Sequence, residues 1–283
     1  MIIDKKGGVF MSDCNHDCSH CSQEGCESRV IEKLKPHELS NIKKIYAVIS
    51  GKGGVGKSLV TSLLGASLNK KGHSVAIIDA DVTGPSIPQA FGLKGKLVES
   101  DESGLYPVLS THGVKVMSAN LLLEDNEAPI IWRGPLVASF VQQLFTDVIY
   151  GDVDYMLIDM PPGTGDIPLT VFQMIPIDGI IVVSSPQELV SMVVAKSINM
   201  AKMMNIPIIG VAENMAYIKC PKCDEKITVF GDGHFYDDVK RHGLDVLCEI
   251  PIDPELAKKV DLGQIEEYKT NVMDKIVSII EKR

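Results

Sequence analysis

An eight-residue stretch of this chain has the residue types and spacing of a phosphate-binding loop. It fits the pattern G-x-x-x-x-G-K-[ST] and consists of Gly51, Lys52, Gly53, Gly54, Val55, Gly56, Lys57 and Ser58. Glycines let backbone N–H groups close around phosphate oxygens, and the N-terminus of a following helix adds partial positive charge. In such a loop Lys57 reaches the β- and γ-phosphates and the Ser58 hydroxyl binds Mg²⁺. The pattern therefore predicts a site for a magnesium-bound nucleoside triphosphate.

Three aspartates follow apolar runs that are typical of buried strands. Asp159 is the last residue of the run 155–159. Asp79 is the last residue of the run 74–79, and Asp81 follows two residues later. A carboxylate at the end of a buried strand near a phosphate-binding loop is where a Mg²⁺-linked acid belongs, and the alternative is an aspartate that caps a turn. Asp79 and Asp81 would point to the same side if the strand continued. One of them could then lie near the metal while the other orients an attacking water.

Cys220 and Cys223 form a C-x-x-C pair, which places two thiolates at metal-ligand spacing. A [4Fe–4S] cluster takes four thiolates, so one chain offers half of a site. A symmetric homodimer would bring two such pairs together at its interface. Three alternatives stay open at this point: Zn²⁺ held by the same four thiolates, a redox-active dithiol, or a simple turn.

A second group of cysteines lies near the N-terminus, and a further cysteine stands alone. The group consists of Cys14, Cys18, Cys21 and Cys26. Four thiolates this close together could hold one iron–sulfur cluster within a single chain. His16 and His20 leave zinc possible, and a tail that relays metal or stays empty is the third alternative. Cys248 stands in an apolar run and is expected to be a buried hydrophobic residue.

The alternation of strand and helix signals predicts a doubly wound α/β fold with a mostly parallel sheet. We expect residues 1–35 to be a flexible cysteine-rich extension and residues 40–283 to be one nucleotide-binding domain. Within residues 92–131 the pattern is weak, and we expect irregular structure apart from one strand. The expected strands are 45–50, 74–79, 114–118, 155–159, 179–184, 208–213 and 246–250. The expected helices are 57–70, 135–148, 187–204 and 272–282.

Composition argues against several classes of partner. The 283 residues carry a net charge of −9, and aromatic residues make up 5%. A nucleic-acid partner is therefore not expected. The N-terminus lacks the apolar segment of a signal peptide, and no apolar run is long enough to span a membrane, so we expect a cytoplasmic protein without a membrane partner. Residues 5–8 could be encoded by a purine-rich ribosome-binding sequence, and we hypothesise that translation starts at Met11 and not at Met1.

The glycine loop resembles the deviant P-loop of the MinD/ParA/nitrogenase-iron-protein class. This resemblance implies a MinD-like (SIMIBI) P-loop NTPase in which Lys52 reaches the nucleotide of a homodimeric partner. It also implies that Asp81 activates water and that Asn214 reads the adenine, although Asn214 could instead shape a turn. Further segments resemble the Mrp/ApbC-type iron–sulfur cluster carriers: 79–88, 132–135, 161–166, 213–215 and 220–223.

The resemblance to cluster carriers implies an ATPase with slow hydrolysis. A [4Fe–4S] cluster would bridge two subunits through Cys220 and Cys223. A cluster-assembly system would donate it, and apo iron–sulfur proteins would receive it while ATP gates loading or release. The catalytic residues would be Lys52, Lys57 and Asp81, and Ser58, Asp79 and Asp159 would bind Mg²⁺. Some members carry a four-cysteine N-terminal extension. The rival interpretations are a MinD/ParA-type positioning ATPase and a nitrogenase-iron-protein-like reductase. The first does not need the C-x-x-C pair, and the second uses different cysteine spacing.

Overall fold

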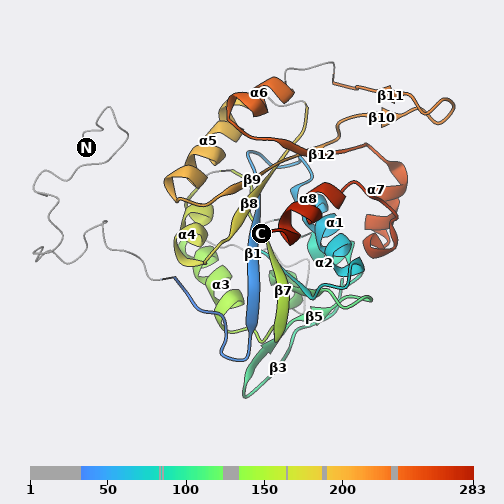
Figure 1. The fold of residues 1–283 in the computed structure, drawn as a ribbon. Coiled ribbons are helices and arrows are strands. Elements are labelled where there is room, and N and C mark those ends of the chain that lie inside the picture. Colours follow the sequence, from blue (N-terminus) through green and yellow to red (C-terminus); the bar gives the residue numbers. More distant parts are fainter. Residues whose placement is uncertain are drawn as a thin grey trace, which may run out of the picture. The chain divides into compact units, whose positions relative to one another are not determined.

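A mostly parallel sheet of eight strands is the centre of the fold in the computed structural model (Figure 1). The structure describes residues 33–82, 84, 86–123, 134–163, 165–186, 190–230 and 235–283. The strand order is β12-β9-β8-β1-β7-β2-β6-β5, and the short edge strand β5 is the antiparallel member. The strands of this sheet are β1 (Asn41–Ser50), β2 (Val75–Asp79), β5 (Val108–Leu109), β6 (Lys115–Ser118), β7 (Asp152–Asp159), β8 (Gly179–Ser184), β9 (Ile208–Asn214) and β12 (Val246–Ile250).

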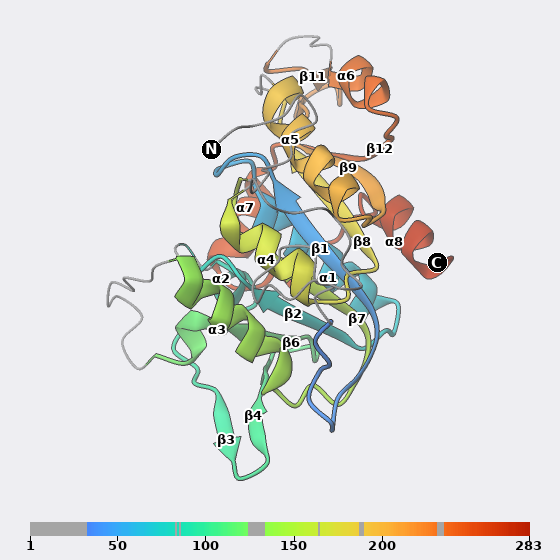
Figure 2. The same cartoon turned by 90° about the vertical axis from the view of Figure 1, so that its left-hand side faces the viewer.

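Helices cover both faces of the sheet, as the parallel strands require (Figures 1 and 2). One face carries α3 (Gly134–Thr146), α4 (Asp166–Met174), α5 (Val190–Met203) and α6 (Phe235–Arg241). The other carries α1 (Lys57–Lys70), α2 (Ile87–Ala90), α7 (Pro254–Asp261) and α8 (Asp274–Glu281). Two small antiparallel hairpins project from this arrangement. They are β3 (Glu99–Asp101) with β4 (Gly104–Tyr106), and β10 (Ile218–Lys219) with β11 (Lys226–Ile227).

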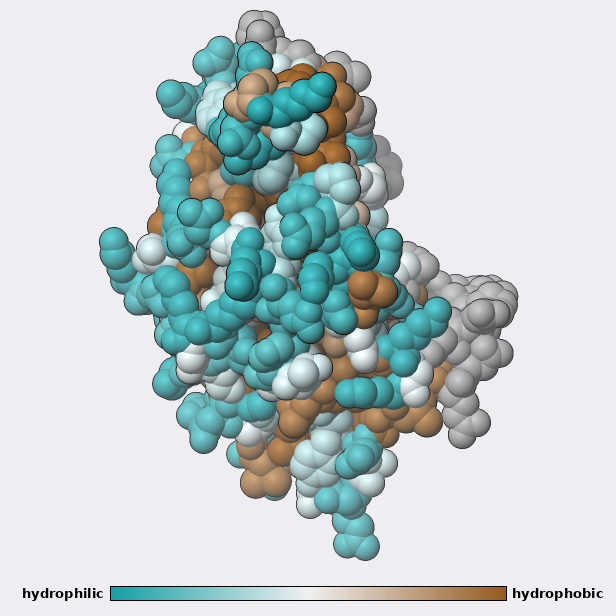
Figure 3. Space-filling view, turned by 90° about the vertical axis from the view of Figure 1, so that its right-hand side faces the viewer, coloured by the Kyte–Doolittle hydropathy of each residue, from teal (hydrophilic) through white to brown (hydrophobic). Residues whose placement is uncertain are grey.

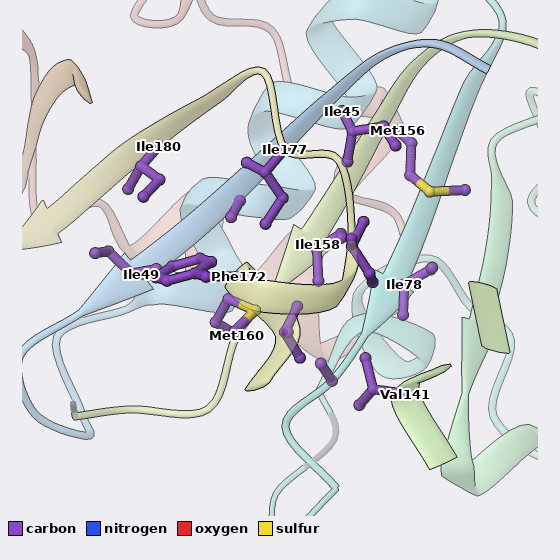
Figure 4. Packing of buried hydrophobic residues seen from close by; sticks show 14 of the residues in the cluster. Ile45, Ile49, Ile78, Val141, Met156, Ile158, Met160, Phe172, Ile177 and Ile180 are labelled. Atoms are coloured by element: carbon purple, nitrogen blue, oxygen red, sulfur yellow. The ribbon is translucent and has the colours of Figure 1, made fainter. Parts of the chain in front are cut away.

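The central strand β1 shows why the sheet has two cores. Its side chains alternate between the faces, so Ile45 and Ile49 pack with the α3–α6 side while Tyr46 and Val48 pack with the α1 side. Figure 4 shows the first of these cores, where Ile45 and Ile49 lie among side chains from neighbouring strands and from Phe172 of α4. Because both faces are buried, β1 needs a nearly continuous apolar sequence from Ile45 onward, and this run is what made the strand recognisable.

The predicted fold class is confirmed, and each expected strand and helix corresponds to an observed one. The expectation of irregular structure across residues 92–131 was wrong in part, because strands β3, β4 and β5 lie there beside the expected strand. Helices α2, α4, α6 and α7 and the β10–β11 hairpin were missed. Cys248 is buried, as expected, and the C-terminal helix α8 buries Ile276 and Ile280 against the domain.

Candidate functional site

The glycine loop lies where three neighbouring parallel strands end at the same edge of the sheet. Strand β1 leads into the loop, and β7 and then β2 lie beside it in the sheet. Asp79 and Asp159 are register partners at the ends of β2 and β7. Ligands of open parallel sheets bind at this carboxyl edge, where loops and helix N-termini converge. The topology therefore brings the predicted carboxylates to the loop that was predicted to bind phosphate.

A buried hydrogen-bond network joins the loop to Asp159. The Lys57 ammonium donates to Oδ2 of Asp159 at 2.8 Å, and the Ser58 hydroxyl donates to the same oxygen at 2.5 Å. Thr61 donates its hydroxyl to Oδ1 at 2.7 Å. The Asp159 side chain is fully buried and that of Lys57 is 6% exposed. The carboxylate thus holds both residues that we expect to contact phosphate and metal. Thr61 was missed in the sequence, although it lies one helical turn after Lys57 and so faces the same side.

The two acids after β2 occupy different environments. Asp79 is fully buried, and this burial, followed by the nearby Asp159 charge, holds the pKa of its carboxyl well above the ordinary value. Its Oδ1 accepts the backbone N–H of Asp81 at 3.2 Å. Oδ2 of Asp81 lies 3.8 Å from the Lys57 ammonium. Asp79 and Asp81 were expected to point to the same side if the strand continued, but strand β2 ends at Asp79. The turn after the strand still brings both acids to the loop.

Magnesium fits the donors gathered here. Mg²⁺ prefers oxygen ligands and is bound in proteins by one or two carboxylates together with substrate phosphates and water. The Ser58 hydroxyl and the Asp159 carboxylate lie in direct contact at the mouth of the loop. A cavity of about 330 Å³ is lined by Lys57, Ser58 and Asp81 together with glycines of the loop. The loop, the Ser58 hydroxyl and the Asp81 carboxylate thus border a space large enough for phosphate groups, and the buried Asp159 contacts Ser58.

Asn214 lies directly beneath the loop, at the end of β9. Its side chain is 2% exposed, and its amide donates to the Val55 carbonyl at 2.9 Å. Gly56 has a left-handed φ of 81° and approaches Asn214 so closely that an added Cβ would lie 2.1 Å from the amide nitrogen. Asn214 also borders an apolar cavity of about 360 Å³, together with Leu59 and Ile252. It therefore fixes the loop from below and borders a space next to it.

The two cysteines of the C-x-x-C pair lie in the turn of the β10–β11 hairpin, which Figure 1 shows projecting from the sheet. The Cys220 backbone N–H donates to the Glu225 carbonyl at 2.9 Å, and the Asp224 N–H donates back to the Cys220 carbonyl at 3.0 Å. Cys220 is partly exposed and Cys223 is exposed. The backbone N–H groups of Lys222 and Cys223 lower the pKa of the Cys220 thiol. Thiolates are the metal-binding form, so this turn favours ligation.

Several predicted residues lie outside this description. Residues 14–26 with the N-terminal cysteines, 132–133 and 231–234 are outside the described residues. Lys52 is exposed on the loop. Within the described part of the chain, no group of three or more His, Cys, Asp or Glu side chains is placed to hold a metal ion. In the same part, no helix is long and apolar enough to cross a membrane.

Comparison with known proteins agrees with this geometry. A sequence profile of the ParA group, described as the NUBPL iron-transfer P-loop NTPase, matches residues 41–283. The chain belongs to this family. The NUBPL-type assignment covers every described strand and helix, and it makes the glycine loop the P-loop of a nucleotide-binding protein.

Relatives of this NUBPL-family chain carry a consistent name. The chain is 46% identical over 270 residues to the iron-sulfur cluster carrier protein of Clostridium perfringens, covering 92% of this chain and 94% of that one. It is 42% identical over 262 residues to the iron-sulfur cluster carrier protein of Methanocaldococcus jannaschii, covering 89% and 90% of the two chains.

Two solved structures are similar to this chain. A nucleotide-binding protein from Archaeoglobus fulgidus, in complex with ADP and with Co found, is 44% identical with a TM-score of 0.74 over 82% of this chain and 91% of that one. MinD in the MinC:MinD complex of Aquifex aeolicus is 20% identical with a TM-score of 0.60 over 84% and 94% of the two chains, which shows a shared fold.

Proposed function

We propose that this protein is an ATP-binding carrier that holds an iron–sulfur cluster and transfers it to apo-proteins. The observation that carries the proposal is the placement of two cysteines on a projecting hairpin. This hairpin begins four residues after Asn214, and Asn214 is the residue that bonds to the P-loop. Family membership and the names of the relatives give the cargo, and the A. fulgidus protein with ADP supports nucleotide binding.

The cluster is proposed to be a [4Fe–4S] cargo shared by two subunits of a homodimer. Each hairpin offers Cys220 and Cys223, and such a cluster takes four thiolates, so two hairpins related by a two-fold axis complete one site. Exposed thiols on a projecting turn suit a cargo that must be given away. Zn²⁺ is the alternative occupant of the same thiolates. A second iron–sulfur cluster is proposed for Cys14, Cys18, Cys21 and Cys26, with zinc or no metal as the alternatives.

ATP binding and slow hydrolysis are proposed to gate loading or release. Lys57 holds the β- and γ-phosphates, Ser58 and Asp159 bind Mg²⁺ with Asp79 beside them, and Asp81 positions the attacking water. Lys52 acts on the nucleotide of the partner subunit. Bound Mg²⁺ would neutralise charge on the phosphates. Asn214 lies next to the apolar cavity that we assign to adenine. A cluster-assembly system is the proposed donor, in the cytoplasm, without a membrane or nucleic-acid partner.

Metal analysis of the purified protein tests this function. Iron, sulfide and zinc are measured per dimer after anaerobic reconstitution, in the parent chain and in Cys220→Ala/Cys223→Ala. We expect the double variant to lose the iron of the shared site and to keep any iron held by the N-terminal cysteines. A double variant that keeps all its metal would refute the shared site. The loaded protein is then mixed with an apo iron–sulfur enzyme, and reactivation without added electrons separates a carrier from a reductase.

A further inference from the structure

A charged pair ties the cysteine hairpin to the edge strand of the main sheet. The ammonium of Lys226, on β11, lies 3.1 Å from a carboxylate oxygen of Glu249 on β12. The same ammonium stands 4.2 Å above the centre of the Tyr217 ring, and the Tyr236 hydroxyl donates to the other oxygen of Glu249. Each of these contacts orients one of the two charged groups, so the pair has a defined geometry and is more than a chance surface contact.

The other lysine of the hairpin makes a different contact. Lys219 is the cross-strand partner of Lys226, and it pairs with Asp224 at 2.9 Å. Asp224 belongs to the turn of the same hairpin, and its side chain is 80% exposed. The Lys219 pair therefore stays within the hairpin, whereas the Lys226 pair connects the hairpin to the sheet. Lys219 therefore serves as the control for removing a lysine charge from the hairpin without breaking its connection to the sheet.

Glu249 also stands next to the strand that supports the P-loop. In the parallel pairing of β9 with β12, Glu249 lies opposite Glu213, and Ile250 lies opposite Asn214, which bonds to the P-loop carbonyl. Beyond the strands, the N–H of Ala216 donates to the Ile250 carbonyl at 3.0 Å, and the N–H of Ile252 donates to the Tyr217 carbonyl at 2.8 Å. A continuous set of backbone hydrogen bonds thus connects Asn214 to the start of the hairpin.

The hairpin itself is too small to fix its own orientation. Its two strands have two residues each, and an isolated two-stranded hairpin is marginally stable in water. The isoleucines that pair across it, Ile218 and Ile227, are 36% and 49% exposed. Figure 3, which views the side on which the hairpin projects, shows hydrophobic areas separated by a largely hydrophilic surface. The pose of the cysteines therefore depends on the connection to β9 and β12 and on the Lys226–Glu249 pair.

We propose that Lys226 and Glu249 are positioning residues that couple the pose of Cys220 and Cys223 to nucleotide binding in the P-loop. A change at the Val55 carbonyl reaches Asn214 through their hydrogen bond and then passes along the ends of β9 and β12 to the hairpin. The Lys226 pair makes the hairpin follow these strand ends instead of pivoting where it begins, after Tyr217. This inference rests on the proposed function, because it assigns the coupling between its two sites.

Peptide-resolved alkylation of the full-length, metal-free protein tests the coupling. The rate at which iodoacetamide modifies Cys220 and Cys223 is measured with and without Mg²⁺ and the non-hydrolysable analogue AMPPNP. Mass spectrometry separates this peptide from the N-terminal cysteines. We expect the nucleotide to change the parental rate by about fivefold or more, the lower end of the usual allosteric coupling. Lys226→Met should abolish this change, while Lys226→Arg and the matched control Lys219→Met should retain it.

The outcomes separate this inference from the proposed function. Light scattering first establishes that all variants have the same oligomeric state with AMPPNP, since dimerisation alone could shield the thiols. A Lys226→Met protein that still responds like the parent overturns the inference, as does a Lys219→Met protein that loses the response equally. If the parent protein binds both nucleotide and iron but its cysteines are alkylated at the same rate with and without AMPPNP, the inference is overturned and the proposed function is not. A parent that binds no nucleotide or takes up no iron contradicts the proposed function instead.

Discussion

Replacing Glu213 with glutamine should stabilise this protein at neutral and alkaline pH and leave its stability unchanged in acid. Glu213 lies on β9 and is 5% exposed. Burial raises the pKa of its carboxyl to about 7, from an ordinary value of 4.5, and the negative charge of Glu249 raises it further in the same direction. Glu249 lies opposite in the strand register and keeps its own charge, because hydrogen bonding from Tyr236 and the ion pair with Lys226 lower its pKa.

The sign follows from proton binding. Between pH 4.5 and about 7 the folded protein keeps the Glu213 proton while the unfolded chain has released it. The folded state therefore binds more protons, so the free energy of unfolding falls as pH rises through this window. At 1.36 kcal/mol per pKa unit, the shift corresponds to roughly 3 kcal/mol as an upper bound. Partial solvation next to the surface pair reduces this, and we expect a gain of about 1–3 kcal/mol for Glu213→Gln above the window.

Urea denaturation of the full-length protein across this pH range measures the effect. The difference in unfolding free energy between Glu213→Gln and the parent should be close to zero below pH 4.5 and should grow to its full size above about pH 7. Glu38→Gln, at an exposed position, serves as the control and should show no such growth. A pH-independent difference would mean that Glu213 titrates alike in the folded and unfolded protein, and a variant that is less stable at high pH would mean that Glu213 is ionised and paired in the folded protein.

Three further predictions concern the P-loop. Gly56→Ala should abolish binding of Mg·ADP, measured by calorimetry. The new Cβ would lie 2.1 Å from the Asn214 amide nitrogen, and residue 56 has a left-handed φ that alanine rarely adopts. Tight binding of Mg·ADP by this variant would contradict the close approach of Gly56 to Asn214. Asp159→Ala should lower the free energy of unfolding by up to about 3–5 kcal/mol, because the buried Lys57 ammonium loses its contact at 2.8 Å and keeps the longer one to Asp81 at 3.8 Å. A loss below about 1 kcal/mol would argue against a stabilising buried pair. Asp81→Asn should slow phosphate release from ATP by roughly 10²-fold or more while nucleotide binding persists, and an unchanged rate would remove Asp81 from the reaction.

The sheet could be predicted from the sequence because its strands are buried on both faces. The runs 155–158 and 180–183 are apolar throughout, and few other structures need such runs between helical patterns. The β10–β11 hairpin could not be predicted in this way, since strands of two residues are too short for an alternating pattern. Helix α7 was missed despite a usable signal: Asp253 accepts the N–H of Glu255 as its cap, and Pro254 occupies the first turn.

The contacts of Glu249 could not be predicted from the local sequence. Glu213 and Glu249 become neighbours because β9 and β12 pair in one register, and Lys226 reaches Glu249 because the hairpin folds back toward that edge. Strand order and register arise from packing of the whole sheet. The P-loop could be predicted, because its residues are contiguous in the sequence and form a known motif. The acids near it could be predicted because they stand at the ends of apolar runs.

The placement of Asp159 should make nucleotide and metal binding depend on each other. It holds Lys57 and Ser58 through the same carboxylate oxygen, and these two residues line the cavity at the P-loop. A phosphate that takes the Lys57 ammonium leaves a fully buried carboxylate without its cation, which is unfavourable unless a second cation replaces it. Mg²⁺ next to Ser58 would be that replacement, so phosphate and metal should enter together. Lys57 and Ser58 directly follow Gly56, and the Val55 carbonyl held by Asn214 lies immediately before it, so a shift of the loop on binding would be felt at Asn214. The charge balance at one carboxylate would therefore act, through Asn214, on the strand that leads to the cysteines.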